Sequence, residues 1–190
     1  KMITNIYVLI CVLIFIYIQF IQHGDKWGCA LRLGGFYPPY IQERHQYWRF
    51  ITCHFIHAEF FHFLMNAYAL YQIGHFLEAC LGTVPYLYLI VISMILSSML
   101  SYSASQISSR YYQTLTIGAS GVVFGFFGAI IVLGYVLGGP FMSVLENFAL
   151  VIVINLVYTF MDRHISKTGH IGGLIGGIVA MVMILALHIV

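Results

Sequence analysis

The feature that most constrains this chain is its series of long apolar segments. Six stretches are apolar enough, and close enough to twenty residues long, to cross a bilayer as helices. They cover residues 3–21, 60–80, 84–101, 118–137, 145–161 and 169–190. With 61% hydrophobic and only 7% charged residues, the chain holds more apolar side chains than a soluble domain of 190 residues could bury. The sequence therefore predicts an all-α, polytopic membrane protein built as a bundle of six transmembrane helices.

A long loop, residues 22–59, separates the first two apolar segments. Aromatic residues such as Trp27, Tyr37 and Trp48 are spread along it and suit the membrane interface, so we expect a membrane-associated loop. No repeat and no second domain is visible, and residues 1–190 are expected to form a single transmembrane domain. The first residue is Lys1 instead of Met, which leaves open that both termini are trimmed.

Charge and cysteine content exclude several function classes. A net charge of +2 without any run of Lys or Arg argues against nucleic-acid binding. A channel or transporter would call for paired charges or broken helices at the midplane, and the apolar segments hold almost no charge. The four cysteines stand singly, with no C-x-x-C pair, and are interpreted as small apolar residues: Cys11, Cys29, Cys53 and Cys80.

Polar residues stand near the beginnings of three of the predicted helices. His62 and Asn66 lie four residues apart on one face of segment 60–80, Ser120 opens segment 118–137, and His170 opens segment 169–190. In a six-span protein these three helices enter the membrane from the same side, so the four residues are predicted to share one layer. Because a polar residue inside a span is costly, they are functional candidates.

Glycine stripes indicate which of these helices touch. Gly173 and Gly177 follow His170 on one face, and Gly121 begins a similar stripe beside Ser120. Stripes of small residues let helix backbones approach closely in lipid, although many such contacts carry no chemistry. Here the packing would bring His170 to Ser120, as a serine nucleophile requires, because its hydroxyl is weak until a base takes the proton.

The beginning of segment 118–137 also predicts an oxyanion site. Gly118 permits a tight entry to the helix, whose first N–H groups lack intrahelical partners. An N–H near Ser120, with Asn66 and His62 as side-chain donors, could stabilise a developing oxyanion. No Asp or Glu is obviously placed to orient His170, so the sequence predicts a Ser–His dyad.

Metal binding is the main chemical alternative. His54, His57 and His62 are clustered before and into segment 60–80, and histidine clusters can bind zinc. No H-E-x-x-H motif occurs, and no carboxylate follows at ligand spacing. We expect neither a metal nor another cofactor. His57 is open to two interpretations, facing the site or satisfying loop backbone.

Together these residues resemble the rhomboid family of intramembrane serine proteases. The motifs that carry the resemblance are Trp48-Arg49, His57, His62-x-x-x-Asn66, Glu78, Gly82, Gly118-Ala119-Ser120-Gly121 and His170-x-x-Gly173-x-x-x-Gly177. The resemblance implies a six-helix bundle with Ser120 as nucleophile and His170 as general base. It also implies an oxyanion hole made by Asn66, His62 and the Ser120 N–H.

The resemblance implies further roles. Trp48 and Arg49 would hold the first loop in the membrane, and segment 145–161 would be a mobile wall that admits substrate. Substrates would be single-span membrane proteins cut near small residues. We expect Arg49 and Glu78 to be structural. Phe124 stands where the family often has Tyr, and it can stack on the histidine ring but cannot donate a hydrogen bond.

The orientation and the activity each have an alternative. Basic residues gather in the loops on one side of the six spans, namely Lys26, Arg32, Arg44, Arg49, Arg110, Arg163 and Lys167, against Lys1 on the other. The positive-inside rule would place those loops in the cytoplasm, whereas the family resemblance implies a site open to the non-cytoplasmic side. The alternative function is a non-catalytic rhomboid-like protein that binds transmembrane helices, which would not need both Ser120 and His170. The sequence leaves the substrate and the oligomeric state open.

Overall fold

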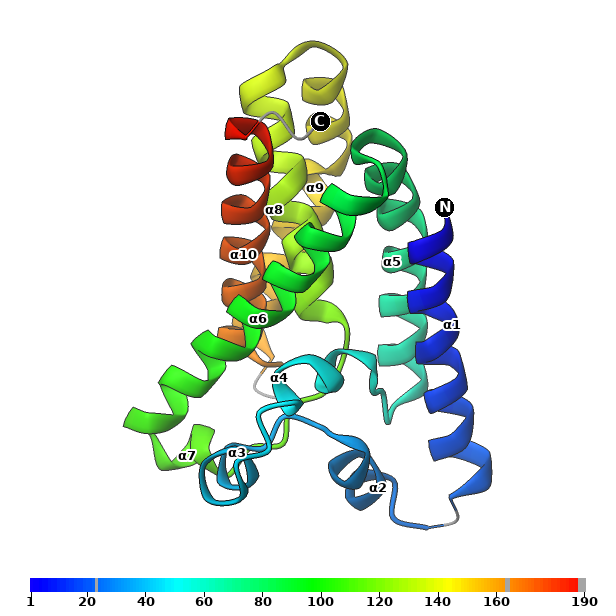
Figure 1. Ribbon diagram of the computed structural model, residues 1–190, viewed down its shortest axis with the longest axis vertical. Coiled ribbons are helices and arrows are strands. Elements are labelled where there is room, and N and C mark those ends of the chain that lie inside the picture. The colour runs from blue at the N-terminus through cyan, green and yellow to red at the C-terminus, as the bar shows by residue number, and fades with distance from the viewer. Residues whose placement is uncertain (23, 163–164, 188–190) are drawn as a thin grey trace.

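The computed structural model describes residues 1–22, 24–162 and 165–187, and this part of the chain is almost entirely helical (Figure 1). The elements in order are α1 (Met2–Ile16), a π-helical turn η1 (Tyr17–Ile21), α2 (Lys26–Leu33), α3 (Pro38–Arg44), α4 (Arg49–Thr52), a 3-10 turn η2 (Cys53–Phe55), α5 (Phe60–Leu81), α6 (Thr83–Ile107), α7 (Ser109–Tyr112), α8 (Ser120–Leu137), α9 (Gly139–Met161) and α10 (Lys167–Ala186).

Within the described residues, five helical stretches are long and apolar enough to cross a membrane. They are Met2–Ile21, Thr83–Ile107, Ser120–Leu137, Gly139–Met161 and Lys167–Ala186. The prediction of an all-α, polytopic membrane protein is therefore confirmed. The remaining predicted span forms α5, a helix of 22 residues that is not among these five. The count of six spans stays a prediction.

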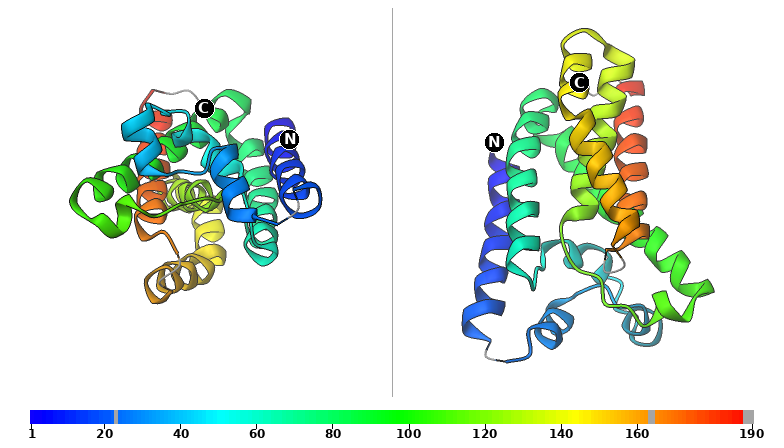
Figure 2. Two further views of the ribbon diagram at one scale, coloured as in Figure 1. Left: turned by 90° about the horizontal axis from the view of Figure 1, so that it is seen from below. Right: turned by 180° about the vertical axis from the view of Figure 1, so that it is seen from behind.

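The long helices are arranged around α8. Seen from below, α8 lies in the middle of the molecule, α9 lies at one edge, and α1 and α5 run side by side along another (Figure 2). The apolar stretch of α8 is 72% buried, whereas that of α9 is only 17% buried. α8 is thus mostly enclosed by the rest of the bundle, and α9 is the least buried of the five apolar stretches found in the described residues.

The first loop folds into short helices that gather at one end of the bundle. α2, α3 and α4 lie at the end where α5, α8 and α10 begin, and α3 lies beside α7 there (Figure 1). Arg49 is buried there, and its Nη1 donates to the carbonyls of Leu31, at 2.8 Å, and Gly35, at 2.6 Å. Its guanidinium also lies 4.7 Å from the Trp48 ring centroid. Arg49 therefore holds the loop together through its backbone carbonyls, and the membrane association of the loop stays a prediction.

Several predicted boundaries are wrong in the structure. The polar stretch 101–113 is not an open connection, because α6 continues to Ile107 and α7 follows at once. The hydroxyls of Ser101 and Ser105 donate to carbonyls of their own helix, at 3.0 and 2.6 Å. These polar side chains are therefore compatible with a continuous helix, and α6 does not end at them. α9 starts at Gly139 rather than residue 145, with Pro140 in its first turn. The end of the last predicted span, 188–190, lies outside the described residues.

Glu78 connects the end of α5 to the beginning of α1. Its carboxylate accepts hydrogen bonds from the backbone N–H groups of Ile3 and Thr4, both at 3.0 Å, and from the Thr4 hydroxyl at 2.7 Å. The first N–H groups of a helix lack intrahelical partners, and a negative charge is favoured at that end. The contacts of Glu78 thus cap α1 and fix it against α5.

Candidate active site

The turn that leads into α8 can be made only with glycine. Gly118 has φ of 117°, a backbone conformation that residues with a side chain rarely adopt. A Cβ at Gly118 would also stand 2.6 Å from the His62 ring. The Gly118 N–H donates to the Cys53 carbonyl at 3.0 Å, which ties this turn to the first loop. As a result the chain enters α8 in a fixed direction, with Ser120 as its first residue and His62 beside it.

His57 satisfies the backbone of the same turn. Its Nε2 accepts the Ala119 N–H at 3.2 Å, and the side chain is fully buried. Burial lowers the pKa of His57 to about 3, so the ring is neutral at neutral pH and free to accept this bond. Of the two interpretations open for His57, the structure supports the backbone contact.

Ser120 and His170 meet across the interface between α8 and α10. The Ser120 Oγ lies 2.8 Å from His170 Nε2, within hydrogen-bond distance. His170 is buried and Ser120 is half-buried. The Phe124 ring stacks on the imidazole, with centroids 4.1 Å apart and planes 20° apart. A hydroxyl, a base and a ring that fixes the orientation of the base are therefore assembled from two helices.

Glycines make this approach possible. A Cβ at Gly173 would fall on the Gly121 carbonyl oxygen, and a Cβ at Gly177 would fall on that of Gly125. Main chain of α10 thus packs directly on main chain of α8, without intervening side chains. The Ser97 hydroxyl of α6 donates to the Gly169 carbonyl at 2.8 Å and fixes the beginning of α10 from the other side.

The second ring nitrogen of His170 also has a partner, which sequence reasoning missed. The Thr159 hydroxyl of α9 lies 2.7 Å from His170 Nδ1, and Thr159 is 1% exposed. The predicted dyad rested on the absence of a suitably placed Asp or Glu, and Thr159 is neither. Leu145, Ile152 and Thr159 follow one another at intervals of seven and are the buried residues of α9, but the sequence carries no signal that this stripe meets His170.

The structure places His62 and Asn66 at the beginning of α5, on the side of the turn at Gly118. The His62 ring faces Gly118, and the Asn66 amide donates to the His62 carbonyl at 2.8 Å. Asn66 is buried and His62 is half-buried. Both predicted oxyanion donors are thus near the start of α8, while their contact with an oxyanion stays a prediction.

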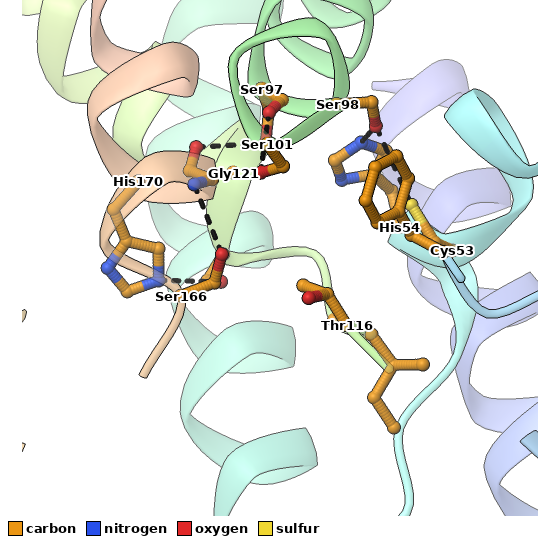
Figure 3. A pocket seen from close by; sticks show the side chains of 14 residues that line it. Cys53, His54, Ser97, Ser98, Ser101, Thr116, Gly121, Ser166 and His170 are labelled. Atoms are coloured by element: carbon orange, nitrogen blue, oxygen red, sulfur yellow. Dashed lines mark hydrogen bonds between the residues drawn. The ribbon is translucent and has the colours of Figure 1, made fainter. Parts of the chain in front are cut away.

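A small cavity has Ser120 and His170 among its lining residues. Figure 3 shows Ser166 and His170 on one side of it, His54 and Cys53 on the other, and serines of α6 between them. Five serines line it, namely Ser97, Ser98, Ser101, Ser120 and Ser166, together with apolar residues such as Phe36 and Ile117. The serine hydroxyls are groups to which a water molecule, the second substrate of any hydrolysis, could bond.

His54 and His57 have different hydrogen-bond partners, and the His57 and His62 rings pack edge to face with centroids 5.2 Å apart. His54 Nε2 lies 3.1 Å from both the Met94 carbonyl and the Ser98 hydroxyl, and burial lowers the pKa of His54 to about 4. In the part of the chain that the structure describes, no three His, Cys, Asp or Glu side chains are grouped so that they could hold a metal ion.

Asn155 is a polar residue inside α9, where such residues often form hydrogen bonds between helices. Its amide donates instead to the Val151 carbonyl of its own helix at 2.8 Å. A helix can satisfy an amide internally at a spacing of four residues, so Asn155 needs no partner on another helix.

Comparisons with known proteins point to one family. A family model described as the rhomboid domain matches residues 44–187. The rhomboid protease GluP of Bacillus subtilis is 32% identical over 136 residues, which are 71% of this chain and 25% of GluP. A putative rhomboid protein, L523, of Acanthamoeba polyphaga mimivirus is 33% identical over 132 residues, 68% of this chain and 70% of that protein. Rhomboid-like protease 1 of Toxoplasma gondii is 29% identical over 153 residues, 77% of this chain and 50% of that protein.

The chain covers a minor part of several of these relatives. It spans 25% of GluP and 36% of RHOMBOID-like protein 1 of Arabidopsis thaliana. The family model, which matches residues 44–187, covers the segments that hold the site.

Proposed function

The chain belongs to the rhomboid family, and from this membership we propose that it is an intramembrane serine endopeptidase acting through Ser120 and His170. The observation that carries the proposal is the 2.8 Å contact between Ser120 Oγ and His170 Nε2. A serine hydroxyl becomes a useful nucleophile only when a base at this distance can accept its proton. Two of the similar proteins, the rhomboid protease GluP and rhomboid-like protease 1, carry the word protease in their names, which adds support to a proteolytic function.

The proposed reaction proceeds in two steps. Ser120 Oγ attacks the scissile carbonyl carbon while His170 Nε2 takes the hydroxyl proton, and His170 then returns this proton to the leaving amine. Water hydrolyses the resulting acyl-enzyme with His170 again as base. The cavity that includes Ser120 and His170 supports this second step, because several serine hydroxyls in its lining could bind the attacking water.

Negative charge on the substrate oxygen would be stabilised at the beginning of α8. The Ser120 N–H belongs to the first turn of that helix, where the helix dipole favours an anion. Asn66 and His62 are proposed as side-chain donors, and Gly118 keeps the turn open to His62. Phe124, Gly121, Gly173 and Gly177 support the geometry of the pair, and Trp48, Arg49 and Glu78 support the surrounding fold.

Membrane proteins with a single transmembrane helix are the proposed substrates. The site lies at the beginnings of helices long enough to cross a membrane, so a peptide bond must reach it from within or beside the bilayer. α9 is the proposed wall of entry, because only 17% of its apolar stretch is buried. We further propose that α5 is the sixth span and that residues 1–190 form a single rhomboid-like transmembrane domain.

Reconstitution tests the function directly. The protein in liposomes is expected to cleave a single-span membrane protein with small residues near the membrane boundary, and a fluorophosphonate is expected to label Ser120. Both reactions are expected to persist with a chelator. Loss of cleavage in chelator would support a metal mechanism instead, and helix binding without cleavage or labelling would support the non-catalytic alternative.

Asn66→Ala is expected to slow cleavage by roughly 100-fold with little loss of folding, because one oxyanion donor is removed. The rate is measured in liposomes, and folding is followed by thermal unfolding in detergent. Gln72→Ala is the matched control, since Gln72 is an exposed amide on the same helix. A wild-type rate for Asn66→Ala would remove this residue from the oxyanion hole.

We propose that the site opens to the non-cytoplasmic side. The basic residues Lys26, Arg32 and Arg44 favour the opposite orientation, and Arg163 lies outside the described residues. A glycosylation acceptor placed at the exposed turn between α7 and α8 is expected to be modified in a eukaryotic membrane system. Absence of modification there, together with modification of an acceptor in the turn between α8 and α9, would reverse the assignment.

A further inference from the structure

We propose that Thr159 is a positioning residue for His170, so that the unit in this chain is Ser120–His170–Thr159 rather than a dyad. The inference rests on the proposed function, because it concerns how the base of that reaction is held. Its basis is the 2.7 Å contact between Thr159 Oγ1 and His170 Nδ1, the ring nitrogen that does not contact Ser120.

The hydrogen bonds of Thr159 define which ring nitrogen carries the proton. Its hydroxyl donates to the Asn155 carbonyl, four residues earlier in α9, at 2.7 Å. A hydroxyl has a single proton, so Thr159 Oγ1 can only accept from His170 Nδ1. Nδ1 therefore carries the proton in the neutral ring, and Nε2 presents its lone pair to the Ser120 hydroxyl. This is the tautomer that a general base needs.

Thr159 lies on the buried face of α9. The buried residues of α9 are Leu145, Ile152 and Thr159, spaced by seven, and they form the stripe through which this helix meets its neighbours. Two of the three are aliphatic and cannot form hydrogen bonds, whereas a Thr at a membrane helix interface can bond across it. The third is 1% exposed and is directed at His170. A Val at this position would fill nearly the same space but could not accept a hydrogen bond.

The role follows from the chemistry of the base. When His170 takes the proton of Ser120, the ring becomes positively charged and Nδ1–H becomes a stronger donor. Thr159 keeps an acceptor in place for it, and Phe124 restricts the ring from its face. Without Thr159, the buried Nδ1–H would have no partner in this direction, and the ring could rotate or change tautomer. Thr159 touches the base and not the substrate, so it positions and does not react.

Substitution of Thr159 separates this role from packing. Thr159→Val removes the hydroxyl at nearly constant size, Thr159→Ala is a second variant without it, and Thr159→Ser restores it. Tyr158→Phe is the matched control, since it removes a hydroxyl from the neighbouring residue of α9, where Tyr158 bonds Asp162 at 3.2 Å. In liposomes, kcat and KM are measured for a single-span substrate. The second-order rate of fluorophosphonate labelling and the unfolding temperature are measured for each protein.

Thr159→Val and Thr159→Ala are expected to lower kcat and the labelling rate by roughly 10- to 100-fold, the range for leaving a buried donor unpaired. KM and the unfolding temperature of Thr159→Val are expected to stay close to wild type. Thr159→Ser is expected to recover most of both rates, and Tyr158→Phe to match wild type. In an His170→Ala background, Thr159→Val is expected to have no further effect on residual labelling.

Three results would overturn the inference while leaving the proposed function intact. They are wild-type labelling by Thr159→Val, a Thr159→Ser variant as slow as Thr159→Val, or a further loss from Thr159→Val in the His170→Ala background. A wild-type protein that is neither labelled at Ser120 nor active would overturn the proposed function, and the role of Thr159 would fall with it.

Discussion

Ser120→Ala is expected to lower cleavage of a single-span substrate by about 10³-fold or more and to abolish fluorophosphonate labelling. Alanine lacks the oxygen that forms the acyl-enzyme. His170→Ala is expected to cost about as much, because Ser120 Oγ then has no base at 2.8 Å. The double variant is expected to be no slower than either single one, since residues that act as a unit are strongly non-additive.

The measurement is cleavage in liposomes, with folding followed by thermal unfolding. Ser105→Ala is the control, because Ser105 is a buried serine whose hydroxyl donates to the Tyr102 carbonyl within α6, away from His170. It is expected to retain the wild-type rate. Cleavage that survives Ser120→Ala in pure protein would contradict the serine mechanism. Additive losses from Ser120→Ala and His170→Ala would contradict their action as a unit.

Much of the architecture could be predicted because a lipid bilayer restricts the secondary structures that a chain crossing it can adopt. A chain whose backbone must satisfy itself in a bilayer has few folds available, so apolar segments of about twenty residues give helices almost directly. Where prediction was wrong, local polarity was misleading. Ser101 and Ser105 suggested a connection, but each hydroxyl bonds a carbonyl of its own helix, and α6 continues past both. A hydropathy scale measures the preference of a side chain for water, but it does not register that a hydroxyl can bond a carbonyl of its own helix.

The candidate site likewise has residues that could be predicted from the sequence and one that could not. Ser120 and His170 could be found because both stand at helix beginnings, and the glycines beside them specify which helices touch. Thr159 could not be found by the same reasoning, because it lies near the end of a helix and eleven residues from His170 in the chain. A threonine inside a helix is ordinarily explained by a bond to its own backbone, and Thr159 makes that bond too. Only the three-dimensional position of α9 reveals its second contact.

The close contacts of Gly173 and Gly177 with the backbone of Gly121 and Gly125 form a glycine seam between α10 and α8. We expect this seam to link stability to catalysis, and Gly177→Ala tests the link. A Cβ at Gly177 would fall on the Gly125 carbonyl oxygen, which is main chain and cannot rotate away. Alanine favours an isolated helix over glycine by about 1 kcal/mol, but overpacking against backbone costs about 3 kcal/mol, so the net effect is destabilising. We therefore expect a lower unfolding temperature in detergent.

Gly177→Ala is also expected to reduce cleavage, although Gly177 lies two helical turns from His170 and the seam, rather than the site, is altered. If α8 and α10 move apart at Gly177, the 2.8 Å contact between Ser120 and His170 must lengthen, and a misplacement near 1 Å can cost roughly 100-fold in rate. Ile175→Ala is the control on the exposed face of α10, where Ile175 is 45% exposed. Ile175→Ala is expected to leave both the unfolding temperature and the cleavage rate near wild type. A Gly177→Ala protein as stable and active as wild type would show that the helices tolerate a wider seam, and that close packing is not what holds the base against Ser120.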